Sequence, residues 1–464
     1  MNKAKKYLQL YISLLTFGFS FTFPIISEAK SPPNFVLIFM DDQGYQDVGV
    51  FGSKTIKTPN LDNMAKEGMK FTDFYSLAAV CSPSRAGLMT GCYPPRVGIT
   101  KVLFPRDKIG LNPNETTIAE VLKTKNYSTA AIGKWHIGHL PQFLPTNHGF
   151  DSYYGIPYSN DMDGIKGKNR NLDRAWIERD SSPWNVPLLR NTKEIERPVD
   201  QNNITKRYTL EAQKFIKKNK NKPFFLYLPH SMPHIPLFVS DEFYSNNPKE
   251  AYIRTIQEID HSVGQILETI KEEGIDNNTL VIFTSDNGPW HLKLRHHGGS
   301  ALPLRGAKFS TWEGGMRVPT IMRWPGKIPS GSVCKEIAAA CDLLPTFAEL
   351  ADAELPKRKI DGKNIWKLMS GETNAKSPHS NFYYFRGNEL RAIRSGFWKL
   401  HIAKKNKKQK QPLLSLYNLA DDISERNEVS AKNQEVVKRL YSNAQAFDKD
   451  LKANVRPPGK ITEN

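Results

Sequence analysis

The 464-residue sequence is poor in cysteine, with only Cys81, Cys92, Cys334 and Cys341. So few and so scattered thiols argue against a zinc cluster and against a disulfide framework. A single disulfide stays open: Cys334 and Cys341 are close in sequence, but the sequence does not fix a pairing. No cysteine lies in the first 80 residues, which excludes a bacterial lipoprotein.

Long apolar runs are also missing beyond the N-terminal segment, so nothing later in the chain approaches a transmembrane span. The N-terminus has three early lysines, an apolar run over residues 7–26 and then Ser27-Glu28-Ala29, a pattern typical of a secretory signal peptide. We expect cleavage after Ala29 and an exported protein, periplasmic or secreted, without stable membrane association. An uncleaved anchor is the alternative, and Pro24 within the run argues against it.

Acidic residues are outnumbered, with 65 Lys and Arg against 47 Asp and Glu, a net charge of +18. A composition of 39% hydrophobic and 24% charged residues is that of a folded globular protein. The positive excess indicates an anionic partner. Nucleic acid is disfavoured because the sequence has no basic motif interleaved with aromatic residues. The lysine tract over residues 404–410 is predicted to be a solvated hairpin tip.

Four short apolar runs predict buried strands: residues 35–40, 128–132, 224–228 and 280–283. Helical patterns lie between them, over residues 116–125 with Thr116 as the expected cap and over residues 253–270. Strands that alternate with helices predict an α/β fold with a large mixed, mostly parallel sheet between helices. Residues 151–205 are polar and irregular, and we expect them to be loops over the core.

The pattern changes near residue 379, where short apolar runs follow one another closely, as in an antiparallel sheet. A helical stretch over residues 433–451 comes after them. We therefore predict a signal peptide over residues 1–29, a catalytic domain over residues 30–378 and a small C-terminal antiparallel-sheet subdomain over residues 379–464.

Polar groups follow each of the four predicted strands. Because the carboxyl ends of strands line the ligand crevice of open α/β sheets, we expect these groups to share one site. A helix cap or a surface turn would explain any one pair alone. In chain order the groups are Asp41 and Asp42, Lys134 and His136, His230 and His234, and Asp286 and Asn287.

The segment Cys81-Ser82-Pro83-Ser84-Arg85 resembles the C-x-P-x-R motif of the formylglycine-dependent sulfatase family, in which the cysteine is converted to formylglycine. Further blocks resemble the family's blocks in the family's order. They are Asp41-Asp42-Gln43-Gly44, Thr58-Pro59-Asn60-Leu61-Asp62, Gly133-Lys134-Trp135-His136, Pro233-His234, Ser285-Asp286-Asn287-Gly288, and Lys308 before Trp312-Glu313-Gly314-Gly315. The resemblance implies an alkaline-phosphatase-like fold and sulfate ester hydrolysis, with a sulfated carbohydrate as the substrate class and a separate formylglycine-generating maturation enzyme.

An unmodified Cys81 beside Arg85 at a helix start is expected to be a thiolate of lowered pKa. An aldehyde hydrate at the same position provides one hydroxyl to attack sulfur and a second that later expels sulfate. Asp41, Asp42, Asp286 and Asn287 supply only oxygen ligands, which favours Ca²⁺, with Mg²⁺ second, over Zn²⁺. By resemblance, the metal also touches the modified residue 81.

The resemblance further assigns roles to the charged residues. Arg85 holds the aldehyde hydrate, Lys134 and Lys308 bind sulfate oxygens, and Asp286 is the base for the attacking hydroxyl. His234 is the acid for the leaving alcohol and His136 the base that triggers sulfate release.

Two alternatives remain at this stage: a phosphate mono- or diesterase on the same scaffold, and a non-catalytic binder of sulfated glycans. Other residues are weaker candidates for a substrate subsite, with a surface loop as the equal or preferred interpretation. They are His139, His230, His291, His296, His297, Asp161, Asp163, Arg170 and Arg174.

Overall fold

The computed structural model describes residues 32–292, 294–403 and 412–461, all of which fall in the unit Pro32–Asn464. The predicted signal peptide and the lysine tract at 404–410 lie outside the described residues. Within those ranges, no helix has both the length and the apolar character needed to cross a membrane.

The four predicted strands lie side by side and parallel at the centre of a large sheet, in the order β10 (Thr279–Ser285), β1 (Asn34–Met40), β9 (Phe224–Pro229) and β5 (Ser128–Ile132). Every residue of β1 is buried. Its side chains alternate between two hydrophobic cores, one on each face of the sheet. Coverage of both faces explains why these strands read as continuous apolar runs.

Shorter strands extend the sheet on both sides. Beyond β10 lie β11 (Thr320–Arg323), β2 (Met69–Phe71) and β12 (Ser332–Cys334), with β11 antiparallel to both of its neighbours. Beyond β5 lie β6 (Ser152–Gly155), which is parallel, and the antiparallel β7 (Leu188–Arg190) and β8 (Lys193–Glu196).

The prediction that residues 151–205 are loops is wrong, because they contain β6, β7, β8 and helix α4 (Leu172–Glu178). The strands are three or four residues long, and β8 is a charged, largely exposed edge strand. Strands this short show no clear apolar period, and the edge strand β8 has little apolar pattern, which is why the sequence did not reveal them.

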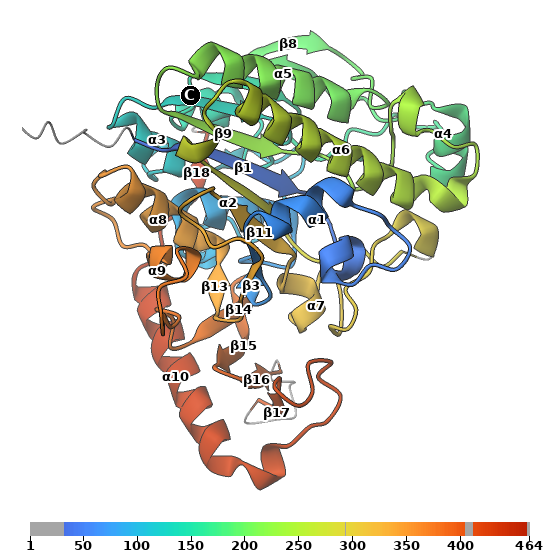
Figure 1. Cartoon of the computed structure of the whole chain (residues 1–464). Helices are drawn as coiled ribbons and strands as arrows, with labels where there is room; N and C mark the ends of the chain where they lie inside the picture. The colour runs from blue at the N-terminus through green and yellow to red at the C-terminus, as the bar shows by residue number, and fades with distance from the viewer. Residues whose placement is uncertain (1–31, 293, 404–411, 462–464) are drawn as a thin grey trace, which may run out of the picture. The chain divides into compact units, whose positions relative to one another are not determined.

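Helices cover both faces of the sheet (Figure 1). One face carries α1 (Pro59–Lys66), α5 (Ile204–Asn219) and α6 (Ala251–Glu272), and the other carries α2 (Cys81–Thr90), α3 (Ile118–Lys123) and α8 (Leu343–Leu350). The predicted face of α6 is buried at Ile256, Ile259 and Val263. Helix α3 is capped by Thr117, one residue later than predicted, because Thr117 and Glu120 form a reciprocal capping box.

The predicted C-terminal antiparallel sheet is present, with strands β14 (Phe382–Arg386), β15 (Glu389–Ser395), β16 (Trp398–Ile402) and β17 (Leu414–Asn418) in sequence order. Helix α10 (Gln434–Ala453) packs on it (Figure 1). Besides short 3-10 helices, the described residues also form the paired strands β3 (Phe74–Tyr75) and β13 (Ala338–Ala339), the paired β4 (Ile109–Gly110) and β18 (Gly459–Lys460), and the one-turn helices α7 (Glu313–Met316) and α9 (Trp366–Met369).

Candidate active site

Cys81 is the first residue of α2, a helix in which every side chain is buried. No side chain caps this helix, so its first N–H groups and its dipole favour an anion at Cys81. The helix ends at Gly91, whose φ of 66° is the left-handed conformation of a glycine C-cap.

The thiol of Cys81 does not behave as the sequence predicted. Burial raises the pKa of Cys81 to about 11, against the opposing effect of Lys134 and Lys308. The expected partner, Arg85, directs its guanidinium to Asp286, at 2.8 and 3.0 Å, and to the carbonyl of Lys134. An unmodified Cys81 is therefore a neutral thiol at neutral pH.

The carboxyl ends of β1 and β10 bring together four of the five predicted metal ligands, and the fifth, residue 81, begins α2. The Asn287 side chain donates to Asp42 at 2.7 Å, and the Asp42 backbone N–H donates to Asp286 at 3.2 Å. Asp41, Asp42, Asp286 and Asn287 are each at most 2% exposed. Three carboxyl groups thus share one buried pocket.

The surrounding cations act unequally on these carboxyl groups. Burial opposes ionisation of Asp41, but Lys134, His234 and Arg85 together lower the pKa of Asp41 below its usual value. Burial, together with the charge of Asp41, raises the pKa of Asp286 to about 7. This pocket therefore lacks enough positive charge to hold all its carboxylates ionised.

The donor set fits a hard divalent cation. Asp41 Oδ1 and Asn287 Oδ1 are buried, and among the described residues neither has a hydrogen-bond partner. Buried oxygens normally have a partner, and a bound cation would provide one for both of these ligand atoms. All four ligands offer oxygen, which suits Ca²⁺ or Mg²⁺.

Two lysines point into the same pocket. Lys308 Nζ lies 2.7 Å from Asp42 Oδ2, and Lys134 Nζ contacts Asp41 and the hydroxyl of Ser159. Burial lowers the pKa of Lys308, but Asp42, Cys81 and Asp41 together outweigh this effect, and the pKa lies above its usual value. Both lysines are therefore placed to bind an anion next to Cys81.

The two predicted acid–base histidines lie in this pocket, and burial lowers the pKa of each. His136 Nε2 donates to the carbonyl of Leu103 at 2.9 Å, and its buried Nδ1 has no partner among the described residues. His234 Nδ1 donates to the carbonyl of Ile235 at 2.7 Å, and its Nε2 lies 3.6 Å from Asp42. Each ring thus directs one nitrogen to the backbone and keeps the other available.

The other histidines and loop residues do not join this group. His230 is buried beside Ser262 and Tyr208, and His139 lies against Tyr158.

The charged loop residues also lie elsewhere. Asp163 forms an exposed ion pair with Arg197, and Arg174 forms one with Glu178. Arg170 is exposed, whereas Asp161 contributes a negative charge near His234. His291 lines a cavity, and His296 and His297 bind Asp173.

Sequence reasoning missed two site residues, Ser159 and Trp290. Ser159 Oγ accepts from Lys134 and lies 3.4 Å from His234 Nδ1, but it sits in the segment expected to be a loop. Trp290 stacks under Lys308 Nζ, 4.3 Å from its ring centroid, and borders a cavity of about 930 Å³. Its position three residues after Asn287, at the end of a strand, was the available signal.

All four cysteines are buried free thiols, so none of the disulfides left open by the sequence forms in the structure.

Comparison with known proteins identifies the family. The sulfatase family model matches residues 33–353, and the model for the C-terminal region of N-sulphoglucosamine sulphohydrolase matches residues 307–450. Arylsulfatase A from Bos taurus is 39% identical over 386 residues, which cover 81% of this chain and 75% of the relative. N-acetylgalactosamine-6-sulfatase from Mus musculus is 39% identical over 387 residues, covering 81% and 72%.

Among solved structures, Ps i-CgsB in complex with k-i-k-neocarrahexaose is similar, with a TM-score of 0.78 and 34% identity over 94% of this chain and 96% of the other. The sulfatases share the alkaline-phosphatase-like fold described above, and the family generally uses formylglycine and a divalent metal. The chain belongs to the sulfatase family and is a sulfuric ester hydrolase.

Proposed function

We propose that this protein is an exported, calcium-dependent sulfatase that removes sulfate from a sulfated carbohydrate, with residue 81 matured to formylglycine. The observation that carries the proposal is the environment of Cys81. Its thiol is neutral, but it sits at a helix N-terminus beside Lys134 and Lys308, where an anionic ester is favoured. An aldehyde hydrate at residue 81 supplies the nucleophile that the thiol does not.

The reaction proceeds in two steps. In the first, one hydroxyl of the hydrate attacks sulfur, its proton passes to Asp286, and the sulfur–oxygen bond to the sugar breaks. The alcohol leaves with a proton from His234. In the second, the remaining hydroxyl loses its proton to His136, the aldehyde re-forms and sulfate departs. Water then rehydrates the aldehyde, Asp286 and His136 release the protons that they accepted, and His234 takes one up. One ester and one water thus give one alcohol, one sulfate dianion and one proton.

The histidine geometry supports these roles. His136 donates from Nε2 to the carbonyl of Leu103, so its lone pair lies on Nδ1. Nδ1 has no partner among the described residues and can therefore accept a proton as a base. His234 donates from Nδ1 to Ile235, so Nε2 is the atom that protonates the leaving oxygen. Burial and Lys308 lower the pKa of His234, and a bound anionic ester offsets Lys308 and restores proton affinity at Nε2.

The remaining charges position the ester. Lys134 and Lys308 bind sulfate oxygens and stabilise the charge that develops as the bond breaks. Arg85 fixes Asp286 through two hydrogen bonds. Asp41, Asp42, Asp286, Asn287 and residue 81 would hold calcium, which would supply Lewis-acid polarisation.

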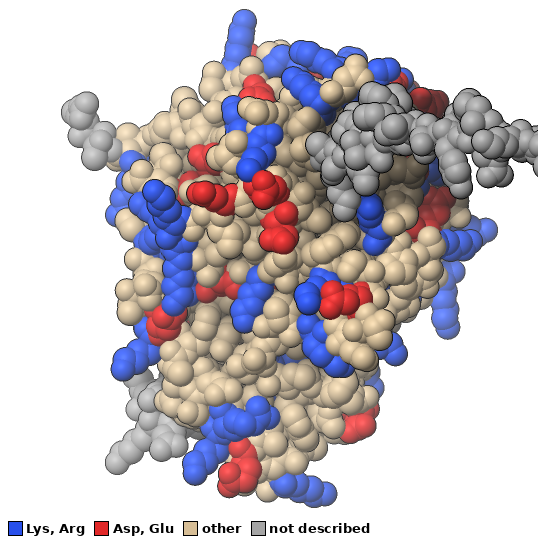
Figure 2. All heavy atoms as spheres, turned by 60° about the vertical axis from the view of Figure 1, so that its left-hand side comes forward, with Lys and Arg blue, Asp and Glu red and all other residues tan. Residues whose placement is uncertain are grey.

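A carbohydrate substrate is supported by the cavity beside Trp290. Its volume of about 930 Å³ is at the upper end of ligand sites, and it extends along residues 298–306 to Ser424 and Arg426. The names of two relatives also point to sugars, N-acetylgalactosamine in one and neocarrahexaose in the other. On the face shown in Figure 2, Lys and Arg lie in separate groups among acidic and uncharged residues.

The first test is the mass of the peptide that contains residue 81, from protein produced together with a formylglycine-generating enzyme. We expect the aldehyde or its hydrate, and we expect Cys81→Ala to abolish turnover of sulfate esters. Cys334→Ala, at a buried cysteine outside the site, is the matched control. Active protein that contains only the intact thiol, or full activity of Cys81→Ala, would refute the mechanism.

The substrate is tested with a panel of sulfated oligosaccharides, with NMR to locate the carbon that loses sulfate. Phosphate esters assayed in parallel must turn over more slowly than sulfate esters. Export is tested by the mass of the mature chain, which we expect to begin at Lys30.

A further inference from the structure

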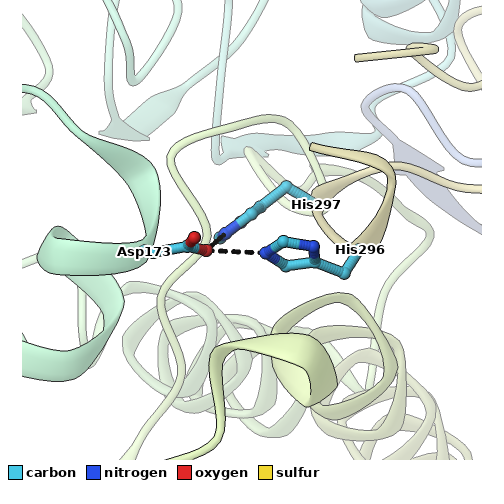
Figure 3. Close-up of side chains that lie close together, drawn as sticks. All are labelled: Asp173, His296 and His297. Carbon is cyan, nitrogen blue, oxygen red and sulfur yellow. Dashed lines mark hydrogen bonds and ion pairs between the residues drawn. The ribbon is translucent and has the colours of Figure 1, made fainter. Parts of the chain in front are cut away.

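Two adjacent histidines and an aspartate meet at a second place in the fold, separate from the pocket around Cys81. His296 and His297 belong to a short 3-10 helix, Arg295–His297, in the segment after β10, and Asp173 belongs to the first turn of α4. Both imidazoles direct Nε2 to the same carboxylate oxygen, with Asp173 Oδ1 at 2.6 Å from His296 and 2.8 Å from His297 (Figure 3). Segments more than 120 residues apart thus converge on one point.

The three side chains differ in exposure in a way that suits a metal site. His297 is 1% exposed, whereas His296 and Asp173 are 25% and 33% exposed. The buried ring gives the site a fixed wall, and the two partly exposed groups give an ion and a water molecule access from solvent. Three protein ligands with an open position is the arrangement of many four-coordinate zinc sites.

The ligand chemistry points to a borderline transition metal rather than to calcium. Two imidazole nitrogens with one carboxylate bind Zn²⁺ or a related divalent ion, whereas Ca²⁺ prefers oxygen alone. The predicted ligands in the catalytic pocket, from Asp41 to Asn287, offer only oxygen and therefore prefer Ca²⁺ to Zn²⁺.

Binding of a tetrahedral ion requires only a small movement of these three side chains. Ligand atoms around a tetrahedral ion with bonds of about 2.0–2.1 Å lie about 3.3 Å apart. The two present nitrogen–oxygen contacts therefore have to open by about 0.6 Å, within reach of side-chain rotation on a partly exposed surface. His297 Nδ1 has no hydrogen-bond partner among the described residues, so no second contact holds the ring in the tautomer that donates to Asp173.

We propose that Asp173, His296 and His297 form a second metal site, which binds one zinc-class divalent ion and ties α4 to the segment that follows β10. That segment continues into Gly298, Ser300 and Leu304, which line the 930 Å³ cavity. The ion thus fixes one wall of the cavity from outside the catalytic pocket. This inference does not depend on the sulfatase mechanism, because it concerns metal binding alone.

The test is a titration of tag-free, full-length Cys81→Ala protein with Co²⁺ in excess Ca²⁺. The alanine removes the thiol, and the calcium occupies the oxygen site. We expect one equivalent of Co²⁺ with the visible absorption of a four-coordinate ion, and displacement of it by Zn²⁺.

In the same background, His297→Ala and Asp173→Asn should weaken binding at least about 100-fold, since loss of a direct ligand exceeds the loss from an outer partner. His296→Gln is the milder variant, at a partly exposed position, in case His297→Ala fails to fold. His261→Ala, at a histidine that packs on Phe243, is the matched control and should bind as before.

Absence of a stoichiometric Co²⁺ equivalent would overturn the proposal, and so would undiminished binding by His296→Gln and Asp173→Asn. In either case the three residues form only a hydrogen-bonded contact between α4 and its neighbour. Because no turnover is measured, failure here leaves the sulfatase proposal untouched, and failure of the mass test at residue 81 leaves this proposal untouched.

Discussion

Replacement of Lys399 by Met is expected to destabilise the fold without changing the catalytic pocket. Lys399 lies on β16 with no solvent exposure, and its Nζ is 2.8 Å from Glu313 and 3.0 Å from Glu425, both also fully buried. Methionine keeps the apolar stem and removes only the charge. The variant therefore leaves two buried carboxylates without their shared cation.

The magnitude follows from what remains around Glu313. Removing one partner of a buried ion pair costs about 3–5 kcal/mol. Arg317 and Arg394 stay within 3.4 and 3.7 Å of Glu313 and offset part of the loss. We therefore expect about 3 kcal/mol, which lowers the melting temperature by about 3 °C at an unfolding entropy of about 0.9 kcal/mol per degree for about 430 residues.

The pH dependence of this destabilisation tests the reasoning more sharply than its size at one pH. In the native protein burial opposes ionisation of Glu313, but Lys399 and the two arginines hold the pKa of Glu313 below its usual value. In the variant that pKa rises, so the destabilisation is full above the folded pKa and shrinks as acid protonates the carboxyl. Denaturant unfolding at several pH values measures this difference.

Lys452→Met is the matched control, since Lys452 is 67% exposed and pairs with Asp448 on the surface of α10. We expect no measurable change for it. An unfolding midpoint of Lys399→Met equal to that of the native protein, or a deficit that grows as the pH falls, would refute the reasoning.

Three further outcomes are expected. Treatment with EGTA should abolish activity and lower the melting temperature, with recovery on addition of Ca²⁺; activity that survives full removal of the metal contradicts the assigned site. Trp290→Ala should raise KM for sulfated oligosaccharides more than it lowers kcat, as steady-state kinetics on short and long substrates will show. Gly133→Ala should prevent folding, measured by soluble yield and circular dichroism, because φ is 134° and a Cβ would lie 1.9 Å from the carbonyl oxygen of Pro229.

The central strands could be predicted because the sheet is covered on both faces. Double coverage makes β1, β5, β9 and β10 nearly pure apolar runs, and each run ends sharply where polar groups begin. The abrupt change from Met40 to Asp41 therefore marks both the strand end and the site, whereas β10 continues through Thr284 and Ser285 before Asp286. The sequence predicted the convergence of the ligands from this pattern alone.

What the sequence could not reveal depends on three-dimensional competition between groups. The pKa of Cys81 looked lowered from its neighbours in sequence, but complete burial outweighs the charges of Lys134 and Lys308, and Arg85 binds Asp286 instead. Ser159 was missed because the short strand β6 before it has too few residues to show a period. Local pattern predicts which segments are strands, not which partner a buried charge selects.

The segment from Lys308 to Glu313 reads as a single motif, but its two ends perform separate tasks. Lys308 faces Asp42 and the catalytic pocket, whereas Glu313 faces Lys399 and the C-terminal sheet.

We therefore expect two lysine-to-methionine variants to differ in activity. Lys308→Met should lower kcat by about 10²–10³-fold, the range for loss of one group that stabilises transition-state charge. Because Lys308 and Asp42 also form a buried ion pair, this variant should lose stability as well. Lys399→Met should lower the midpoint and leave kcat per folded molecule unchanged. Equal loss of activity in both variants would mean that the buried ionic cluster positions Lys308, and that the two ends of the segment act as one unit.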